Sequence, residues 1–132
     1  MESLFANATE VLILLFLIIT FLQSGYDKMA DWKGNVSWLT GHFAETPLKN
    51  MVPALLGVIL VTELIAGILC IAGIYQLYCQ GTSLLAMYGA ILSCVVLLML
   101  LFGQRVAKDY DGARTIAIYF IPAIFLVFLL QG

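Results

Sequence analysis

The sequence has few charged residues and few of the residue types that usually build soluble active sites. Only 11% of its 132 residues are charged, and it contains one histidine and three cysteines. A lone histidine cannot supply a histidine metal cluster or two haem ligands within one chain. The cysteines, Cys70, Cys79 and Cys94, lack the paired spacings of zinc sites and redox dithiols. We therefore expect no metal site and no disulfide framework.

Several functional classes are disfavoured by other absences. The net charge is -2, with no clustered excess of lysine and arginine, so we expect no nucleic-acid partner. Phosphate-binding glycine loops, dinucleotide fingerprints and serine-nucleophile motifs are also missing. The sequence carries no cofactor-attachment motif, and we expect no covalently bound cofactor.

Four apolar blocks make up most of the chain. The sequence is 63% hydrophobic with a mean hydropathy of +1.05, more apolar surface than a soluble domain of this size can bury. Each block is close to the ~20 residues that a helix needs to cross a bilayer. The blocks cover about Leu4–Tyr26, Pro53–Tyr78, Ser83–Gly103 and Thr115–Leu130. We predict an all-α integral membrane four-helix bundle, with residues 1–132 as a single transmembrane domain.

The basic residues are confined to two polar stretches, one after the first block and one after the third. They are Lys28, Lys33, Lys49, Arg105, Lys108 and Arg114. Because positively charged loops stay in the cytoplasm, we predict that both termini and the turn at Cys79–Thr82 face the periplasm or the exterior. No basic residue precedes the first block, which we therefore read as a retained span and not as a signal peptide. The expected location is a bacterial inner membrane.

The segment 29–52, between the first two blocks, is too polar to span but contains two tryptophans and other apolar residues. This composition predicts a short interfacial amphipathic helix that begins near Asn35. Membrane anchoring explains the tryptophans better than ligand stacking does. Thr46-Pro47 has the form of a helix start, and Pro53 predicts a bend where span two enters the hydrocarbon.

Glu63 is the acidic residue predicted to lie deepest in the hydrocarbon, which makes it a functional candidate. Helical spacing places it on a face of small residues, and the third block has a similar face. The two faces consist of Ala66, Gly67, Cys70 and Gly73, and of Ala86, Gly89, Ala90 and Ser93. Glu63 could handle protons or contact a quinone, a substrate or another subunit. Alternatively, hydrogen bonds to Ser93, Thr20 or Tyr119 could make it purely structural, and both readings stay open.

Other candidates lie near the predicted cytoplasmic boundary. His42 is read either as a surface imidazole bound to a headgroup or backbone, or as a proton-shuttling or substrate-binding group. Lys28 or Arg105 could orient an anionic group there. Arg105, Lys108 and Arg114 belong to a charged loop that is either simply solvated or bound to an anionic lipid headgroup.

Polar and turn positions over most of the chain resemble those of one membrane-protein family. They are Gly25-Tyr26-Asp27-Lys28, Trp38, His42-Phe43, Thr46-Pro47-Leu48, Glu63, Gln104-Arg105-Val106-Ala107-Lys108-Asp109-Tyr110 and Gly112-Ala113. In these positions the sequence resembles the DoxX family of small four-helix membrane proteins, in particular a branch common in Bacteroidetes-type bacteria. The resemblance assigns Gly25 and Lys28 to a Gly-x-x-Lys junction after span one.

The resemblance implies a membrane subunit that supports quinone- or thiol-linked redox chemistry, because the family name comes from a subunit of a thiosulfate-to-quinone oxidoreductase. Any redox role would depend on a bound quinone or on a partner subunit. A helix-packing or assembly subunit of a membrane complex is the alternative, and a small transporter ranks last. Whether the chain is an enzyme stays open. Besides the lipid bilayer, we expect a partner membrane subunit or a homo-oligomer.

Overall fold

The computed structural model describes residues 7–80 and 82–131 of the chain. Within these residues it contains α-helices, one short 3₁₀-helix and no strand. The four long helices are α2 (Ala8–Ala30), α4 (Val52–Cys79), α5 (Leu84–Val106) and α6 (Tyr110–Gln131). All four are long and apolar enough to cross a membrane, which confirms the predicted all-helical fold with four spans. The first residues of the predicted span one, at 4–6, lie outside the described part.

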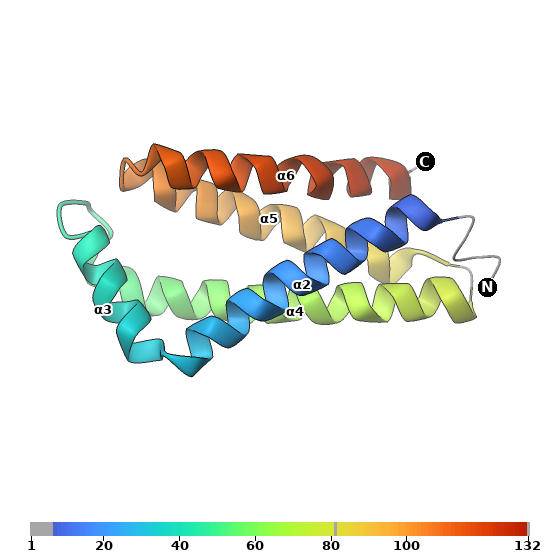
Figure 1. The fold of residues 1–132 in the computed structure, drawn as a ribbon, viewed down its shortest axis with the longest axis horizontal. Coiled ribbons are helices and arrows are strands. Elements are labelled where there is room, and N and C mark those ends of the chain that lie inside the picture. Colours follow the sequence, from blue (N-terminus) through green and yellow to red (C-terminus); the bar gives the residue numbers. More distant parts are fainter. Residues whose placement is uncertain (1–6, 81, 132) are drawn as a thin grey trace.

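The long helices form an antiparallel bundle (Figure 1). Helix α4 packs against both α2 and α5, α5 packs against α6, and a smaller contact joins α6 to α2. Short connections between α4 and α5 and between α5 and α6 make these pairs antiparallel neighbours. The start of α2 and the end of α6 therefore lie at one end of the bundle, and the α5–α6 connection lies at the other.

Small residues let α4 and α5 approach each other closely. A Cβ atom added to Gly73 would lie 2.6 Å from the Cα atom of Ala86, and one added to Gly89 would lie 3.0 Å from the backbone nitrogen of Cys70. The small-residue faces of both helices are buried, including Ala66, Gly67, Cys70, Gly73, Ala86, Gly89, Ala90 and Ser93. These faces pack inside the chain, so they are not available to dock a partner helix.

Large apolar side chains cover the outside of the bundle. Leu12, Ile68, Leu98, Ile121 and Phe128 are between 50% and 68% exposed, and they come from all four long helices. A water-soluble monomer rarely exposes so much contiguous apolar surface. A lipid bilayer would cover this apolar surface. Helices can lie in the bilayer because each satisfies its own backbone hydrogen bonds.

A short helix, α3 (Trp32–His42), follows α2 and lies across one end of the bundle (Figure 1). It confirms the predicted helix between spans one and two, although it begins at Trp32 and not near Asn35. The Asp31 carboxylate caps it by accepting a hydrogen bond from the Gly34 backbone N–H at 3.2 Å. Helix α2 itself continues to Ala30, beyond its predicted end at Tyr26.

The predicted helix start at Thr46-Pro47 is wrong, whereas span two begins at Val52, next to its predicted start at Pro53. The Thr46 hydroxyl does accept a hydrogen bond from the Leu48 backbone N–H at 3.2 Å, but it stabilises a turn. The 3₁₀-helix η1 (Lys49–Met51) then leads into α4. Pro53 lies in the first turn of α4, where a missing N–H donor costs little, so it begins the helix and does not bend a longer one.

Candidate functional site

Glu63 forms an ion pair with Lys28 in the interior of the bundle. The Lys28 Nζ atom lies 2.9 Å from Glu63 Oε1, and the two side chains are 15% and 1% exposed, respectively. Neither carboxylate oxygen of Glu63 has a hydrogen-bond partner of good geometry among the described residues. Removing one member of such a pair leaves a charge buried without compensation, which is costly. We call Lys28 and Glu63 the buried pair.

The Gly-x-x-Lys sequence at the end of α2 explains how this pair forms. Gly25 and Lys28 are three residues apart and therefore lie on the same face of the helix. A Cβ atom added to Gly25 would lie 2.7 Å from Leu64 Cδ2, so the missing side chain lets α2 approach α4 beside Glu63. The Lys28 ammonium also donates a hydrogen bond to Ser24 Oγ at 2.5 Å, one helical turn back. The α2 backbone thus positions the lysine over the acid.

The predicted hydrogen bond between Glu63 and Ser93 is wrong. The Ser93 hydroxyl donates to the Gly89 backbone carbonyl within its own helix, at 2.7 Å. No hydrogen bond links Glu63 to Thr20 or Tyr119 in the described part of the chain. The Tyr119 ring lies instead 6.0 Å from the ring of Phe16 in an edge-to-face contact.

Spacing within each helix did not reveal Lys28 as the partner of Glu63, because it does not determine how two helices cross. Glu63 lies about 17 Å along α4 from its start, at the usual helical rise, whereas Lys28 lies in the last turn of α2. The two helices cross at an angle, and α4 extends beyond the end of α2 towards α3 (Figure 1). A residue near the end of α2 can therefore meet a residue in the middle of α4.

A mostly apolar cavity of about 640 Å³ lies beside the buried pair, among α3, α4 and α5. Its polar wall residues are Lys28, Asn35 and Gln104, and its apolar wall includes Trp38 and Phe102. This combination of volume, apolar lining and a few polar groups is typical of small-molecule sites. Lys28 lines the cavity, whereas Glu63 does not. We call this space the α3 cavity.

His42 connects α3 to the α5–α6 connection at the edge of the α3 cavity. Its Nε2 atom lies 3.4 Å from Gln104 Oε1 and 3.6 Å from Asp109 Oδ2. The ring stacks on Trp38 with centroids 4.7 Å apart. Because Trp38 and Gln104 both line the cavity, these contacts hold part of its wall in place. These side-chain contacts of His42 were not predicted from the sequence.

Comparison with known proteins assigns the family. The model of the DoxX family matches residues 11–102, more than two thirds of the chain. The chain belongs to the DoxX family. Neither the curated proteins nor the solved structures yield a match. The DoxX match includes both members of the buried pair and the whole of α3, but it ends before Gln104 and Arg105.

The remaining candidates of this DoxX protein lie apart from the α3 cavity. Arg105 is placed over the Tyr110 ring, with its Cζ atom 5.2 Å from the ring centroid. Arg105, Ser93 and Tyr119 are not among the described residues that line the cavity. Of the two cations predicted to orient an anionic group, Lys28 lines the cavity and Arg105 does not.

The cysteines of this DoxX protein are not grouped for metal binding. Cys70 and Cys94 are buried and Cys79 is exposed, and all three are free thiols. Across residues 7–80 and 82–131, no set of three or more histidine, cysteine, aspartate and glutamate side chains is arranged to hold a metal ion.

Proposed function

We propose that this DoxX protein is a membrane subunit that binds a quinone in the α3 cavity and handles protons through the buried pair. The observation that carries the proposal is the double role of Lys28, which pairs with Glu63 inside the bundle and lines the cavity. A quinone fits the chemistry of this space, because it combines an apolar tail with carbonyl oxygens that accept hydrogen bonds.

The ammonium of Lys28 supports this assignment through its donor count. A lysine ammonium has three N–H donors. One is directed to the Ser24 hydroxyl and a second faces the Glu63 carboxylate. The third is available to a carbonyl oxygen in the cavity, where Asn35 and Gln104 offer further amide donors. Such a small number of polar groups in an apolar wall fixes the orientation of a ligand.

Proton handling follows from the position of the acid behind the amine. Reduction of a quinone to a quinol consumes two electrons and two protons. Lys28 can give one proton to a reduced quinone oxygen and regain a proton from water, and water supplies the second proton of the quinol. Glu63, which does not line the cavity, favours the charged ammonium of Lys28 that is formed again. We assign quinone binding and proton handling to this chain and electron supply to a partner dehydrogenase subunit.

The charge distribution supports a cytoplasmic position for the α3 cavity. Five basic residues lie in the last turns of α2 and α5, in α3, at the α5–α6 connection and near the start of α6, namely Lys28, Arg105, Lys33, Lys108 and Arg114. These segments share one end of the bundle (Figure 1). By the positive-inside rule, this end faces the cytoplasm of a bacterial inner membrane and both termini face the periplasm.

Fluorescence quenching tests quinone binding directly. The chain has two tryptophans, and Trp38 lines the α3 cavity. In a Trp32→Phe background reconstituted into nanodiscs, Trp38 becomes the sole reporter. We expect a short-chain ubiquinone or menaquinone analogue to quench it saturably. Quenching that only rises linearly with quinone in the lipid would contradict the proposal.

Variants of the buried pair then test the role of Lys28. We expect Lys28→Met combined with Glu63→Gln to weaken quinone binding about tenfold, since one charge-assisted hydrogen bond is lost. The double variant leaves no unpaired charge in the bundle, so it keeps the fold. Lys33→Met, which removes an exposed cation of α3, is the matched control and should bind as the parent does. Equal affinity in the double variant would argue against a contact with Lys28.

A further inference from the structure

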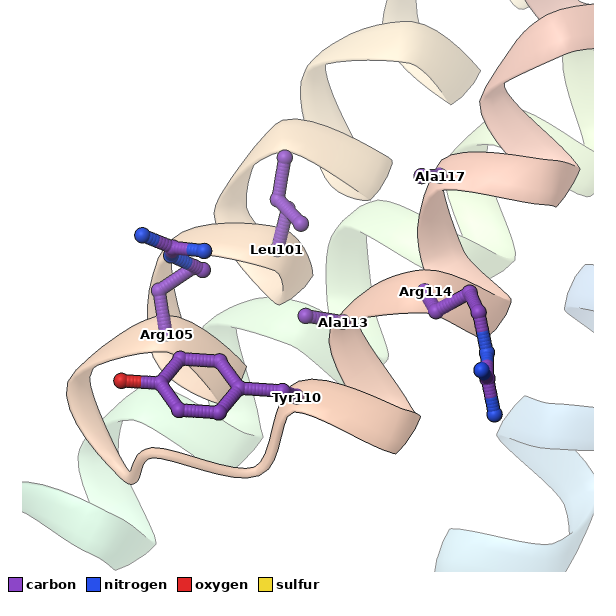
Figure 2. A pocket seen from close by; sticks show the side chains of 6 residues that line it. All are labelled: Leu101, Arg105, Tyr110, Ala113, Arg114 and Ala117. Carbon is purple, nitrogen blue, oxygen red and sulfur yellow. The ribbon is translucent and has the colours of Figure 1, made fainter.

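A second hollow lies on the bundle surface between the end of α5 and the start of α6 (Figure 2). It has a volume of about 420 Å³ and is lined by Leu101, Arg105, Tyr110, Ala113, Arg114 and Ala117. None of these six residues lines the α3 cavity. We call this hollow the α5–α6 groove.

The α5–α6 groove combines a cation at its edge with an apolar floor. Figure 2 shows Arg105 and Tyr110 next to each other at one edge, with Ala113 between them and Arg114. The Arg105 guanidinium stacks on the Tyr110 ring and forms no ion pair with any carboxylate of the described chain. Arg114 differs, because it pairs with Asp111 at 3.0 Å and its guanidinium points away from the groove. Arg105 is therefore the cation that is free to take an anion.

We propose that the α5–α6 groove binds one anionic phospholipid, with its phosphate on Arg105 and an acyl chain along Leu101, Ala113 and Ala117. A guanidinium donates two parallel hydrogen bonds to a phosphate, and stacking on Tyr110 fixes its plane beforehand. The alanines leave room at the floor that a larger side chain would fill.

The position of the groove favours a lipid over a soluble phosphate. Arg105 lies in the last turn of α5 and Tyr110 is the first residue of α6, so both lie where the apolar spans end. Arginine and tyrosine at this depth are typical of the headgroup region. From there the wall continues along α6 through Ala113 and Ala117 towards the hydrocarbon. A free phosphate would leave this apolar wall uncovered.

Native mass spectrometry of the detergent-solubilised full chain tests the proposal. Phosphatidylglycerol and phosphatidylcholine with identical acyl chains are added in equal amounts. We expect one phosphatidylglycerol per chain, retained at least about fivefold better than phosphatidylcholine. Equal retention of both lipids would overturn the proposal. So would displacement of phosphatidylglycerol by millimolar inorganic phosphate, because the site would then recognise a soluble anion.

Two variants and two controls locate the binding. Arg105→Gln removes the guanidinium, and Ala117→Leu fills the floor on an exposed face where a larger apolar residue is tolerated. We expect each variant to reduce the ratio of retained phosphatidylglycerol to retained phosphatidylcholine to about one. Lys33→Gln and Lys108→Gln should keep the parent's ratio, since both lysines are exposed and neither lines the groove. Unchanged preference in Arg105→Gln, or equal losses in all four variants, would overturn the assignment.

Discussion

The ion pair of Lys28 with Glu63 and that of Arg114 with Asp111 have nearly the same length, 2.9 Å and 3.0 Å, but very different surroundings. The first is almost completely buried between α2 and α4. In the second, the side chains are 73% and 91% exposed, and water and salt screen their attraction. Loss of one partner is therefore expected to cost about 3–5 kcal/mol at the buried site and about 0–1 kcal/mol at the exposed one. The comparison shows that burial, and not distance, makes the first pair important.

The largest predicted effect is that of Lys28→Met. This change leaves the Glu63 carboxylate in the bundle with no ion-pair partner, and we expect the free energy of unfolding to fall by about 3–5 kcal/mol. Reversible denaturation in mixed detergent micelles measures it. Lys33→Met is the control, because it removes a cation from the same end of the bundle. It should change the free energy of unfolding by less than about 0.5 kcal/mol.

A smaller effect is expected where α4, which carries Glu63, packs closely against α5. Gly73→Ala would place a Cβ atom 2.6 Å from the Ala86 Cα atom, so α4 and α5 must move apart. We expect a loss of about 1–3 kcal/mol by the same unfolding assay. Gly41→Ala on α3 is the matched control, because nothing lies within 4 Å of its added Cβ atom. If both changes were equally harmless, the tight contact of α4 with α5 would be refuted.

The His42 contacts sharpen the comparison, since His42 is half-buried and joins α3 to the α5–α6 connection. His42→Ala removes the stacking on Trp38 and the contacts with Gln104 and Asp109. We expect the free energy of local opening of α3 to fall by about 1 kcal/mol. Amide hydrogen exchange along α3 should become several-fold faster while α4 and α5 stay protected. Unchanged exchange in α3 would show that His42 does not hold the helix.

The smallest effect is predicted for Arg114→Ala at the exposed pair. The expected change in the free energy of unfolding is less than about 1 kcal/mol, and it should shrink further at high salt. Measurement at two salt concentrations tests this. A loss comparable to that of Lys28→Met would contradict the contrast between the two pairs.

The sequence was sufficient to predict the four spans and the burial of Glu63. The length of each apolar block predicted the spans, and the three- and four-residue spacing of small residues identified the inward faces of α4 and α5. It was not sufficient for the partner of Glu63. Ser93 was one of the possible hydrogen-bond partners, but its hydroxyl donates to the Gly89 carbonyl of its own helix.

The misplaced boundaries have physical causes as well. Hydropathy ended span one at Tyr26, whereas the helix continues through Lys28 because the lysine reaches inward to Glu63 and Ser24. Thr46-Pro47 has the composition of a helix start but forms a turn. The α3 cavity could not be predicted, because it depends on how α3 lies across α4 and α5, which no local pattern in the sequence determines.

A double-mutant cycle on Lys28 and Glu63 tests the central claim most directly. The free energies of unfolding of Lys28→Met, Glu63→Gln and the double variant are compared with that of the parent protein. If the two side chains form a buried pair, the double variant should be more stable than the sum of the single losses predicts, with a coupling of about 1–3 kcal/mol. Additivity within about 0.5 kcal/mol would contradict the pair and the role assigned to Lys28.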